Sequence, residues 1–155
     1  MSDMPSVLFV CLGNICRSPM AEGALRVATR DAGLDVEIDS AGTGGWHLGN
    51  PPDSRAIATA REKGVDISGL RARQVTEKDF TRFTHIFALD AQNLVDLQRL
   101  APADGTAEVA LLLDIVPGRE GDAVADPYYG DADGFEITWS DVSSAADAIV
   151  RLLGK

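Results

Sequence analysis

Short strand-like runs alternate with segments of helical periodicity along this chain. Residues 6–10 (SVLFV) form a continuously apolar run, which is typical of a strand buried on both faces of a parallel sheet. Three later runs predict further strands at 36–40, 84–90 and 109–116. The pattern therefore predicts four strands spread over the whole length.

Capping residues and periodicity predict a helix at each end of this pattern. Ser18 as N-cap, followed by Pro19 at the first helical position, predicts a helix that stops at Gly33. Near the C-terminus, apolar residues recur at steps of three and four over 135–153, which predicts a long amphipathic helix.

Acidic residues mark the shorter helices in between. Asp53 is predicted to begin a helix that ends near Lys63, and Asp90 is predicted to cap a helix over 91–100. A short helical turn is predicted at 76–79, by analogy with the capping box. Helices are thus expected between all the predicted strands and after the last one.

This alternation predicts an α/β fold with an open, four-stranded, mostly parallel sheet and right-handed crossovers. The 155 residues contain no repeat and no linker, so residues 1–155 are expected to form one domain. Ligands of such sheets bind beyond the carboxyl ends of the strands. The loop after 6–10 is therefore the first place to look for chemistry.

Composition narrows the class of protein. With 45% hydrophobic residues, the chain can bury a core without disulfides. Its N-terminus lacks the basic and long apolar regions of a signal peptide, and no apolar run reaches the roughly 20 residues of a membrane span. The two cysteines do not make a disulfide framework. We expect a cytoplasmic monomer with reduced thiols.

The net charge of -10 argues against nucleic acid and anionic membranes as partners. An anionic substrate would need a local site that works against this overall charge. Between Glu120 and Glu136 there are six acidic residues and no Lys or Arg, so most of this stretch is expected to be a solvated acidic loop.

The segment CLGNICRSP, which begins at Cys11, supplies such a local site. The loop 12–17 joins a strand to a helix, and Gly13 and Asn14 tolerate the positive φ that a tight curl of backbone N–H groups needs. Arg17 adds a planar fork for phosphate oxygens, and the helix adds its positive end. The same groups would stabilise a thiolate at Cys11.

A thiolate inside an anion cradle is a nucleophile aimed at phosphorus. The cradle binds the oxygens of a transferring phosphoryl group, so this chemistry needs no metal and no other cofactor. His47 and His85 are isolated, and His85 is expected to be structural. The sequence also argues against three other kinds of site. It lacks the lysine of a Walker A nucleotide site, the third glycine of a dinucleotide fingerprint and a second ligand pair for zinc.

Hydrolysis also needs an acid for the leaving oxygen and a base for water. Asp126 is the candidate, followed by Pro127 and by two aromatic rings, Tyr128 and Tyr129, that would wall a flat substrate. By itself an Asp-Pro pair favours a generic turn. Its position after the fourth predicted strand, however, puts Asp126 at the same sheet edge as Cys11.

Three segments together, VCLGNICRSPMAE, DSAGTGGWHLGNPPDSRA and DPYYG, closely resemble the low-molecular-weight protein tyrosine phosphatases over essentially the whole chain. The resemblance implies a four-stranded parallel sheet in the order 2-1-3-4 with helices on both faces. It also implies that Cys11 forms a phosphocysteine, Arg17 binds the phosphoryl group, and Asp126 is general acid and then base.

The same resemblance extends to the rest of the site. It implies that Ser18 hydrogen-bonds the thiolate and that Asn14 holds the loop in a strained shape. It matches a further set to the phosphate loop or to the substrate cleft: Leu12, Gly13, Ile15, Cys16, Trp46, Tyr128 and Tyr129. The implied partner is a phosphotyrosine protein: bacterial members often act on a cognate tyrosine kinase of polysaccharide export, and others act on host proteins.

Several alternatives stay open at this point. Relatives that dephosphorylate phosphoarginine carry threonine where this chain has Ile15, which favours phosphotyrosine. Arsenate reductases of similar fold need additional cysteines. A phosphate-binding or redox-sensing module would use the same cradle without turnover. Cys16 is either a small apolar filler or the partner of Cys11 in a protective disulfide, and the specificity set by His47 and Asn50 is open.

Overall fold

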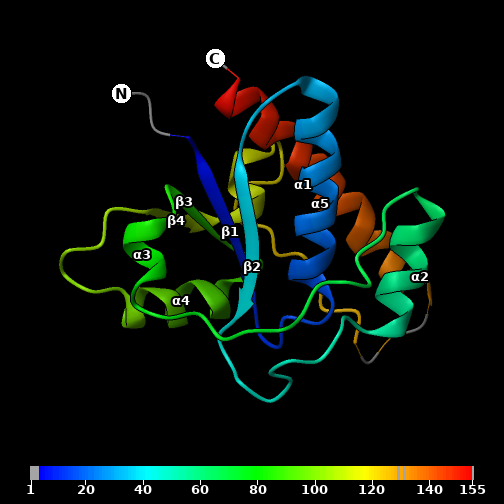
Figure 1. Ribbon diagram of the computed structural model, residues 1–155, viewed down its shortest axis with the longest axis horizontal. Coiled ribbons are helices and arrows are strands. Elements are labelled where there is room, and N and C mark those ends of the chain that lie inside the picture. The colour runs from blue at the N-terminus through cyan, green and yellow to red at the C-terminus, as the bar shows by residue number, and fades with distance from the viewer. Residues whose placement is uncertain (1–3, 129, 131, 155) are drawn as a thin grey trace.

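A four-stranded parallel sheet forms the centre of the molecule (Figure 1). The computed structural model describes residues 4–128, 130 and 132–154. The sheet has the order β2-β1-β3-β4, with the strands β1 Ser6–Cys11, β2 Glu37–Gly42, β3 His85–Ala88 and β4 Glu108–Leu111. The predicted fold class and the order 2-1-3-4 are confirmed.

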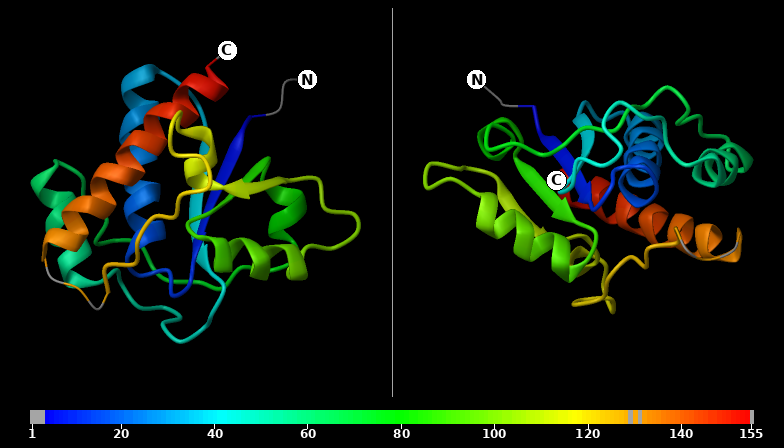
Figure 2. Two further views of the ribbon diagram at one scale, coloured as in Figure 1. Left: turned by 180° about the vertical axis from the view of Figure 1, so that it is seen from behind. Right: turned by 90° about the horizontal axis from the view of Figure 1, so that it is seen from below.

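Helices cover both faces of this sheet (Figures 1 and 2). One face carries α1 (Arg17–Ala32) and α5 (Ala132–Leu153), with α2 (Ser54–Glu62) beside them. The other face carries the short α3 (Asp79–Arg82) and α4 (Ala91–Leu100). Within the described residues no helix is both long and apolar enough to cross a membrane.

The central strand β1 contributes to the core on both faces, and all six of its residues are buried. Phe9 and Cys11 belong to the core packed under α1 and α5, whereas Leu8 and Val10 belong to the core packed under α3 and α4. Alternation of side chains along a strand produces this division. The strand therefore ends with Cys11, opposite Gly42 of β2, on the α1 side.

Most predicted helix ends are confirmed. Gly33 ends α1 in the left-handed conformation with φ 71°. The Asp53 carboxylate accepts the backbone N–H of Arg55 at 2.8 Å, and the Asp90 carboxylate accepts that of Asn93 at 2.7 Å. These bonds satisfy amide groups that the first turn of a helix leaves without partners.

The prediction that Ser18 caps the first helix is wrong. Helix α1 begins at Arg17 and Cys16 occupies the N-cap position, so Ser18 and Pro19 lie inside the first turn. Ser18 is fully buried, and its hydroxyl bonds to Cys11 and Asn14 instead of to the helix backbone.

The predicted strand at 109–116 is also only partly correct. Strand β4 ends at Leu111, and the 3₁₀ turn η1 (Leu112–Ile115) follows it. An apolar run does not by itself distinguish a buried strand from a tight turn with buried side chains. The turn takes the chain off the sheet, and the backbone N–H of Val124 then donates to the backbone oxygen of Leu89, just after the end of β3, at 2.8 Å.

Candidate active site

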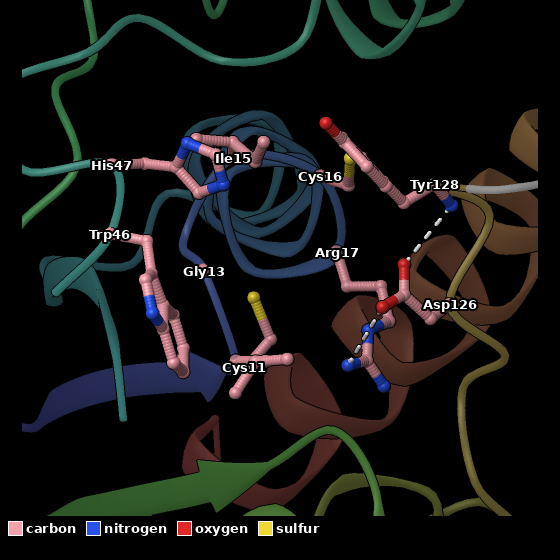
Figure 3. A pocket seen from close by; sticks show the side chains of 10 residues that line it. Cys11, Gly13, Ile15, Cys16, Arg17, Trp46, His47, Asp126 and Tyr128 are labelled. Carbon is pink, nitrogen blue, oxygen red and sulfur yellow. Dashed lines mark hydrogen bonds and ion pairs between the residues drawn. The ribbon is translucent and has the colours of Figure 1, made fainter. Parts of the chain in front are cut away.

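A cleft of about 310 Å³ lies beyond the carboxyl end of β1 (Figure 3). Every predicted site residue lines it except Asn14, Ser18 and Tyr129. Asn14 and Ser18 are buried, and Tyr129 lies outside the described residues. His47, whose role the sequence left open, is an additional lining residue.

The loop between β1 and α1 turns at Asn14, which has φ 58° and is the one non-glycine residue with positive φ in the described part of the chain. Asparagine tolerates this conformation better than most side chains. The same expectation for Gly13 is wrong, since its φ is not positive. Gly13 instead leaves room for His47, because an added Cβ would lie 3.0 Å from His47 Cδ2.

The Cys11 thiol points into this cleft and lies 3.0 Å from the Ser18 hydroxyl oxygen (Figure 3). That oxygen already accepts a hydrogen bond from Asn14 Nδ2 at 2.8 Å. Ser18 can therefore donate its hydroxyl hydrogen either to the sulfur of Cys11 or to the backbone oxygen of Ala41, which is 3.5 Å away. A thiolate at this position would gain a charge-assisted hydrogen bond.

Asn14 is held by contacts on both ends of its amide. Its Nδ2 also donates to Ser40 Oγ at 3.0 Å, and its Oδ1 accepts the backbone N–H of Arg73 at 3.0 Å. Ser40 in turn donates to the buried carboxylate of Glu22 at 2.7 Å. Hydrogen bonds therefore run continuously from Cys11 to Glu22.

Burial raises the pKa of Glu22, although hydrogen bonds from Ser40 and Arg26 oppose the shift. Ser40, Glu22 and Arg73 were not predicted as site residues. None of the three carried a sequence signal for this role, since Glu22 does not fall on an apolar stripe of its helix.

Replacing Asn14 with alanine is expected to lower the free energy of unfolding by about 2–4 kcal/mol. Alanine has a β-carbon but no polar group to stabilise the left-handed backbone conformation, and the substitution also removes a buried hydrogen-bond partner. Urea unfolding monitored by circular dichroism measures this change. Asn50→Ala, at an exposed asparagine, is the control, and equal stability losses in both variants would contradict the role of Asn14.

Successive backbone amides of the loop are available for an anion. No backbone N–H of residues 13–17 donates to an acceptor in the described part of the chain. Asn14, Cys16 and Arg17 are nevertheless buried. Buried donors without partners are costly, and a bound oxyanion would satisfy them.

Arg17 is nearly inaccessible, with 3% of its side chain exposed, and is fixed from two sides. Its Nη1 donates to Asp90 Oδ2 at 2.7 Å and to the backbone oxygen of Val124 at 3.0 Å. Burial alone would lower the pKa of Arg17, but the charges of Cys11, Asp90 and Asp126 outweigh it and raise that pKa. The guanidinium therefore stays charged beside the cleft.

Asp126 lies across the cleft and faces Arg17, with Oδ2 3.7 Å from Nη2 (Figure 3). Its Oδ1 accepts the backbone N–H of Tyr128 at 3.1 Å, which makes the local turn that an Asp-Pro pair favours. Asp126 can therefore be both a turn residue and the candidate acid and base. The turn fixes a carboxyl group that is 42% exposed and reachable from the cleft.

Aromatic side chains form the walls of the cleft. Trp46 is 72% exposed and its ring lies against Gly44, where an added Cβ would be 1.8 Å from Trp46 Cζ3. The rings of His47 and Tyr128 are 6.5 Å apart. The opening is therefore bordered by flat side chains suited to an aromatic substrate.

The two cysteines differ in their surroundings. Burial, together with the charge of Asp53, raises the pKa of Cys16 far above its usual range, so this thiol stays protonated. This favours the interpretation of Cys16 as a small apolar filler. A disulfide between Cys16 and Cys11 stays a prediction, since both thiols are free.

The residues described in the structure do not form a group of three or more His, Cys, Asp or Glu side chains able to hold a metal ion. His85 lies away from the cleft, where its Nδ1 is 3.0 Å from Thr84 Oγ1 and its Nε2 is 3.4 Å from Glu108. These contacts agree with the structural role predicted for His85.

Comparisons with known proteins agree on one family. The model of the low molecular weight phosphotyrosine protein phosphatases matches residues 6–155. The low molecular weight protein-tyrosine-phosphatase YfkJ of Bacillus subtilis is 47% identical over 128 residues, which cover 81% of this chain and 82% of that protein.

Solved structures match the fold over nearly the whole chain. The crystal structure of Primo-1 matches with a TM-score of 0.93 at 39% identity and covers 98% of this chain and 100% of that one. The crystal structure of DARP, a Drosophila arginine phosphatase, matches with a TM-score of 0.91 at 30% identity and covers 96% and 98% of the two chains.

Proposed function

This chain belongs to the low molecular weight phosphotyrosine protein phosphatases, and we propose on this basis that it hydrolyses phosphotyrosine in proteins. The arrangement of Cys11 supports the proposal most directly. Its sulfur lies in the cleft beside the Ser18 hydroxyl, next to a charged Arg17 and a loop whose amides have no acceptor among the described residues. A nucleophile surrounded by donors for an oxyanion is suited to phosphoryl transfer.

Binding comes first in the proposed mechanism. The phosphoryl oxygens accept hydrogen bonds from the amides of residues 13–17 and from Arg17, which Asp90 and Val124 hold in place. The aromatic ring of the substrate then lies between Trp46 and the pair His47 and Tyr128.

In the first chemical step, the Cys11 thiolate attacks phosphorus and a sulfur–phosphorus bond forms. The bond from phosphorus to the phenolic oxygen breaks, and its electron pair goes to that oxygen. Protonated Asp126 gives its proton to the oxygen, so tyrosine leaves as a neutral phenol. Donors already in place stabilise the charge on the transferring group.

The second step regenerates the enzyme. Asp126, now a carboxylate, takes a proton from a water molecule that attacks the phosphocysteine. The sulfur–phosphorus bond breaks and Cys11 leaves as a thiolate, which the Ser18 hydroxyl stabilises by its hydrogen bond. Inorganic phosphate is the product.

A test of this function is a hydrolysis assay with a phosphotyrosine peptide and with p-nitrophenyl phosphate. We expect turnover that vanadate inhibits and a chelator does not affect, because backbone amides and Arg17 supply the stabilising charge. Loss of activity in chelator, restored by a divalent metal ion, would contradict this mechanism. Complete inactivity towards both substrates would favour a phosphate-binding or redox-sensing module.

The likeness to an arginine phosphatase makes phosphoarginine a second candidate substrate. Ile15 lines the cleft at the position where the resemblance implies threonine in phosphoarginine phosphatases, and this favours phosphotyrosine. Parallel assays with a phosphoarginine peptide and with arsenate plus thiol separate these alternatives.

We also propose the setting of this activity. One domain over residues 1–155 acts as a cytoplasmic monomer on a phosphotyrosine protein, and a cognate tyrosine kinase is one candidate partner. Substrate trapping with the Cys11→Ser or Asp126→Ala variant in the source cell identifies that partner.

A further inference from the structure

The side chain of Arg55 bridges the beginning of α2 and the loop that carries Asp126. Its Nη2 donates to the backbone oxygen of Tyr128 at 2.9 Å, and its Nη1 donates to the backbone oxygen of Gly130 at 3.2 Å. We propose that Arg55 is a positioning residue for the acid and base step. It would act by holding the backbone around Tyr128 in place relative to the phosphate loop.

Arg55 is itself held in a fixed orientation. Its Nε and Nη2 donate to the two carboxylate oxygens of Asp53 at 3.0 Å each. Its guanidinium also lies over two rings, 4.7 Å from the centre of Phe135 and 5.7 Å from that of Tyr128. Such bidentate and stacked contacts need the planar fork of arginine and would not be reproduced by lysine.

This contact extends to the phosphate loop through Asp53. The backbone N–H of Asp53 donates to the backbone oxygen of Ile15 at 2.8 Å. Hydrogen bonds from Arg55 lower the pKa of the Asp53 carboxyl, so the pair stays charged. The phosphate loop and the Asp126 loop are therefore joined through Asp53 and Arg55.

Tyr128 links Arg55 to Asp126. Its backbone N–H donates to Asp126 Oδ1 at 3.1 Å, while its backbone oxygen accepts from Arg55. The two bonds lie on the same residue. Movement of Tyr128 would therefore shift the carboxyl group of Asp126 away from a leaving oxygen bound in the cleft.

Basic side chains from outside this acidic loop contact it. Residues 120–136 contain six acids and no Lys or Arg, so the segment has no internal positive charge to hold it. Arg55 reaches the segment from α2, more than 70 residues away from Tyr128 in sequence, and donates to its backbone oxygens, while Lys63 and Arg119 pair with two of its acids. The sequence predicts Asp53 as a helix cap but carries no signal for the role of Arg55.

This inference rests on the proposed function, and it predicts a defect of a specific kind. Without Arg55, proton transfer to the leaving group should be slower, while the affinity for phosphate should be unchanged. The loss should therefore be large for phenols of high pKa, which need a proton to leave, and small for nitrophenols, which do not.

The experiment compares kcat/KM for a series of aryl phosphates in the wild type, Arg55→Met, Asp126→Ala and the double variant. For weakly acidic phenols, we expect Arg55→Met to lose about 10- to 100-fold, the scale of a misplaced catalytic group. We expect no further loss when Arg55→Met is added to Asp126→Ala, because the acid through which Arg55 acts is already gone.

Two controls separate positioning from general damage. Arg61→Met changes an exposed arginine of the same helix and should leave the dependence on the leaving group unchanged. Competitive inhibition by phosphate should be the same in Arg55→Met as in the wild type. If Arg55→Met does not fold, as judged by circular dichroism, Arg55→Lys keeps the charge without the fork and should show the same selective loss.

An equal loss for all leaving groups, or losses that multiply in the double variant, would overturn the role of Arg55. A wild type that does not hydrolyse aryl phosphates, or a fully active Cys11→Ser variant, would instead overturn the proposed function. The two failures are therefore distinguishable when Cys11→Ser is assayed beside these four enzymes.

Discussion

Cys11→Ser is expected to lower kcat by roughly 10⁶-fold, the scale found when an enzyme loses its nucleophile. A serine hydroxyl is a poor nucleophile unless a base takes its proton. Ser18, its neighbour at 3.0 Å, is not such a base. The variant should still bind phosphate, because the loop amides and Arg17 are unchanged.

Steady-state kinetics measures the loss, and equilibrium binding of phosphate shows that the loop is intact. Cys16→Ser is the matched variant, since it removes the other buried thiol. We expect a far smaller effect there, because burial keeps Cys16 protonated. Equal losses in the two variants, or full activity of Cys11→Ser, would contradict the assignment of Cys11 as the nucleophile.

Asp126→Ala is expected to lower kcat/KM by roughly 10²- to 10⁴-fold for phosphate esters of weakly acidic phenols, the range of general acid catalysis. Asp126 faces Arg17 across the cleft and is kept in place by the N–H of Tyr128. Alanine removes the proton donor and leaves the phosphate loop untouched. The loss should shrink as the leaving group becomes more acidic.

Rates with nitrophenyl and alkylphenyl phosphates measure this dependence on the leaving group. Asp122→Ala is the control, because Asp122 is an exposed acid of the same segment that pairs with Arg119. If Asp126→Ala loses the same factor with every substrate, Asp126 is not the acid of the first step.

The sequence predicted the parts of the site that follow one another along the chain. A strand, a loop with one residue of positive φ and a helix place Cys11 and Arg17 together, and all of these are local signals. Asp126 could be assigned only to the same edge of the sheet. The strand order and the Ser18 contact came from the family resemblance rather than from the residues themselves.

The remaining site residues could not be predicted because their contacts are not local. Arg73 meets Asn14 across 59 residues, and Asp90 meets Arg17 across 73. Neither residue has a sequence signal for this role. Asp90 is already accounted for as a helix cap, and Arg73 contributes its backbone N–H, which every residue except proline has. Packing of distant segments decides such contacts, and one sequence does not show it.

The hydrogen bond from Arg17 to the backbone oxygen of Val124 has a consequence for synthesis of the protein on the ribosome. These two residues are 107 positions apart, and Asp126 follows Val124 almost at once. Cys11 therefore leaves the ribosome long before the backbone that fixes Arg17 exists. A growing chain would carry an ordinary cysteine for most of its translation, and the reactive site would be completed only with the last fifth of the polypeptide.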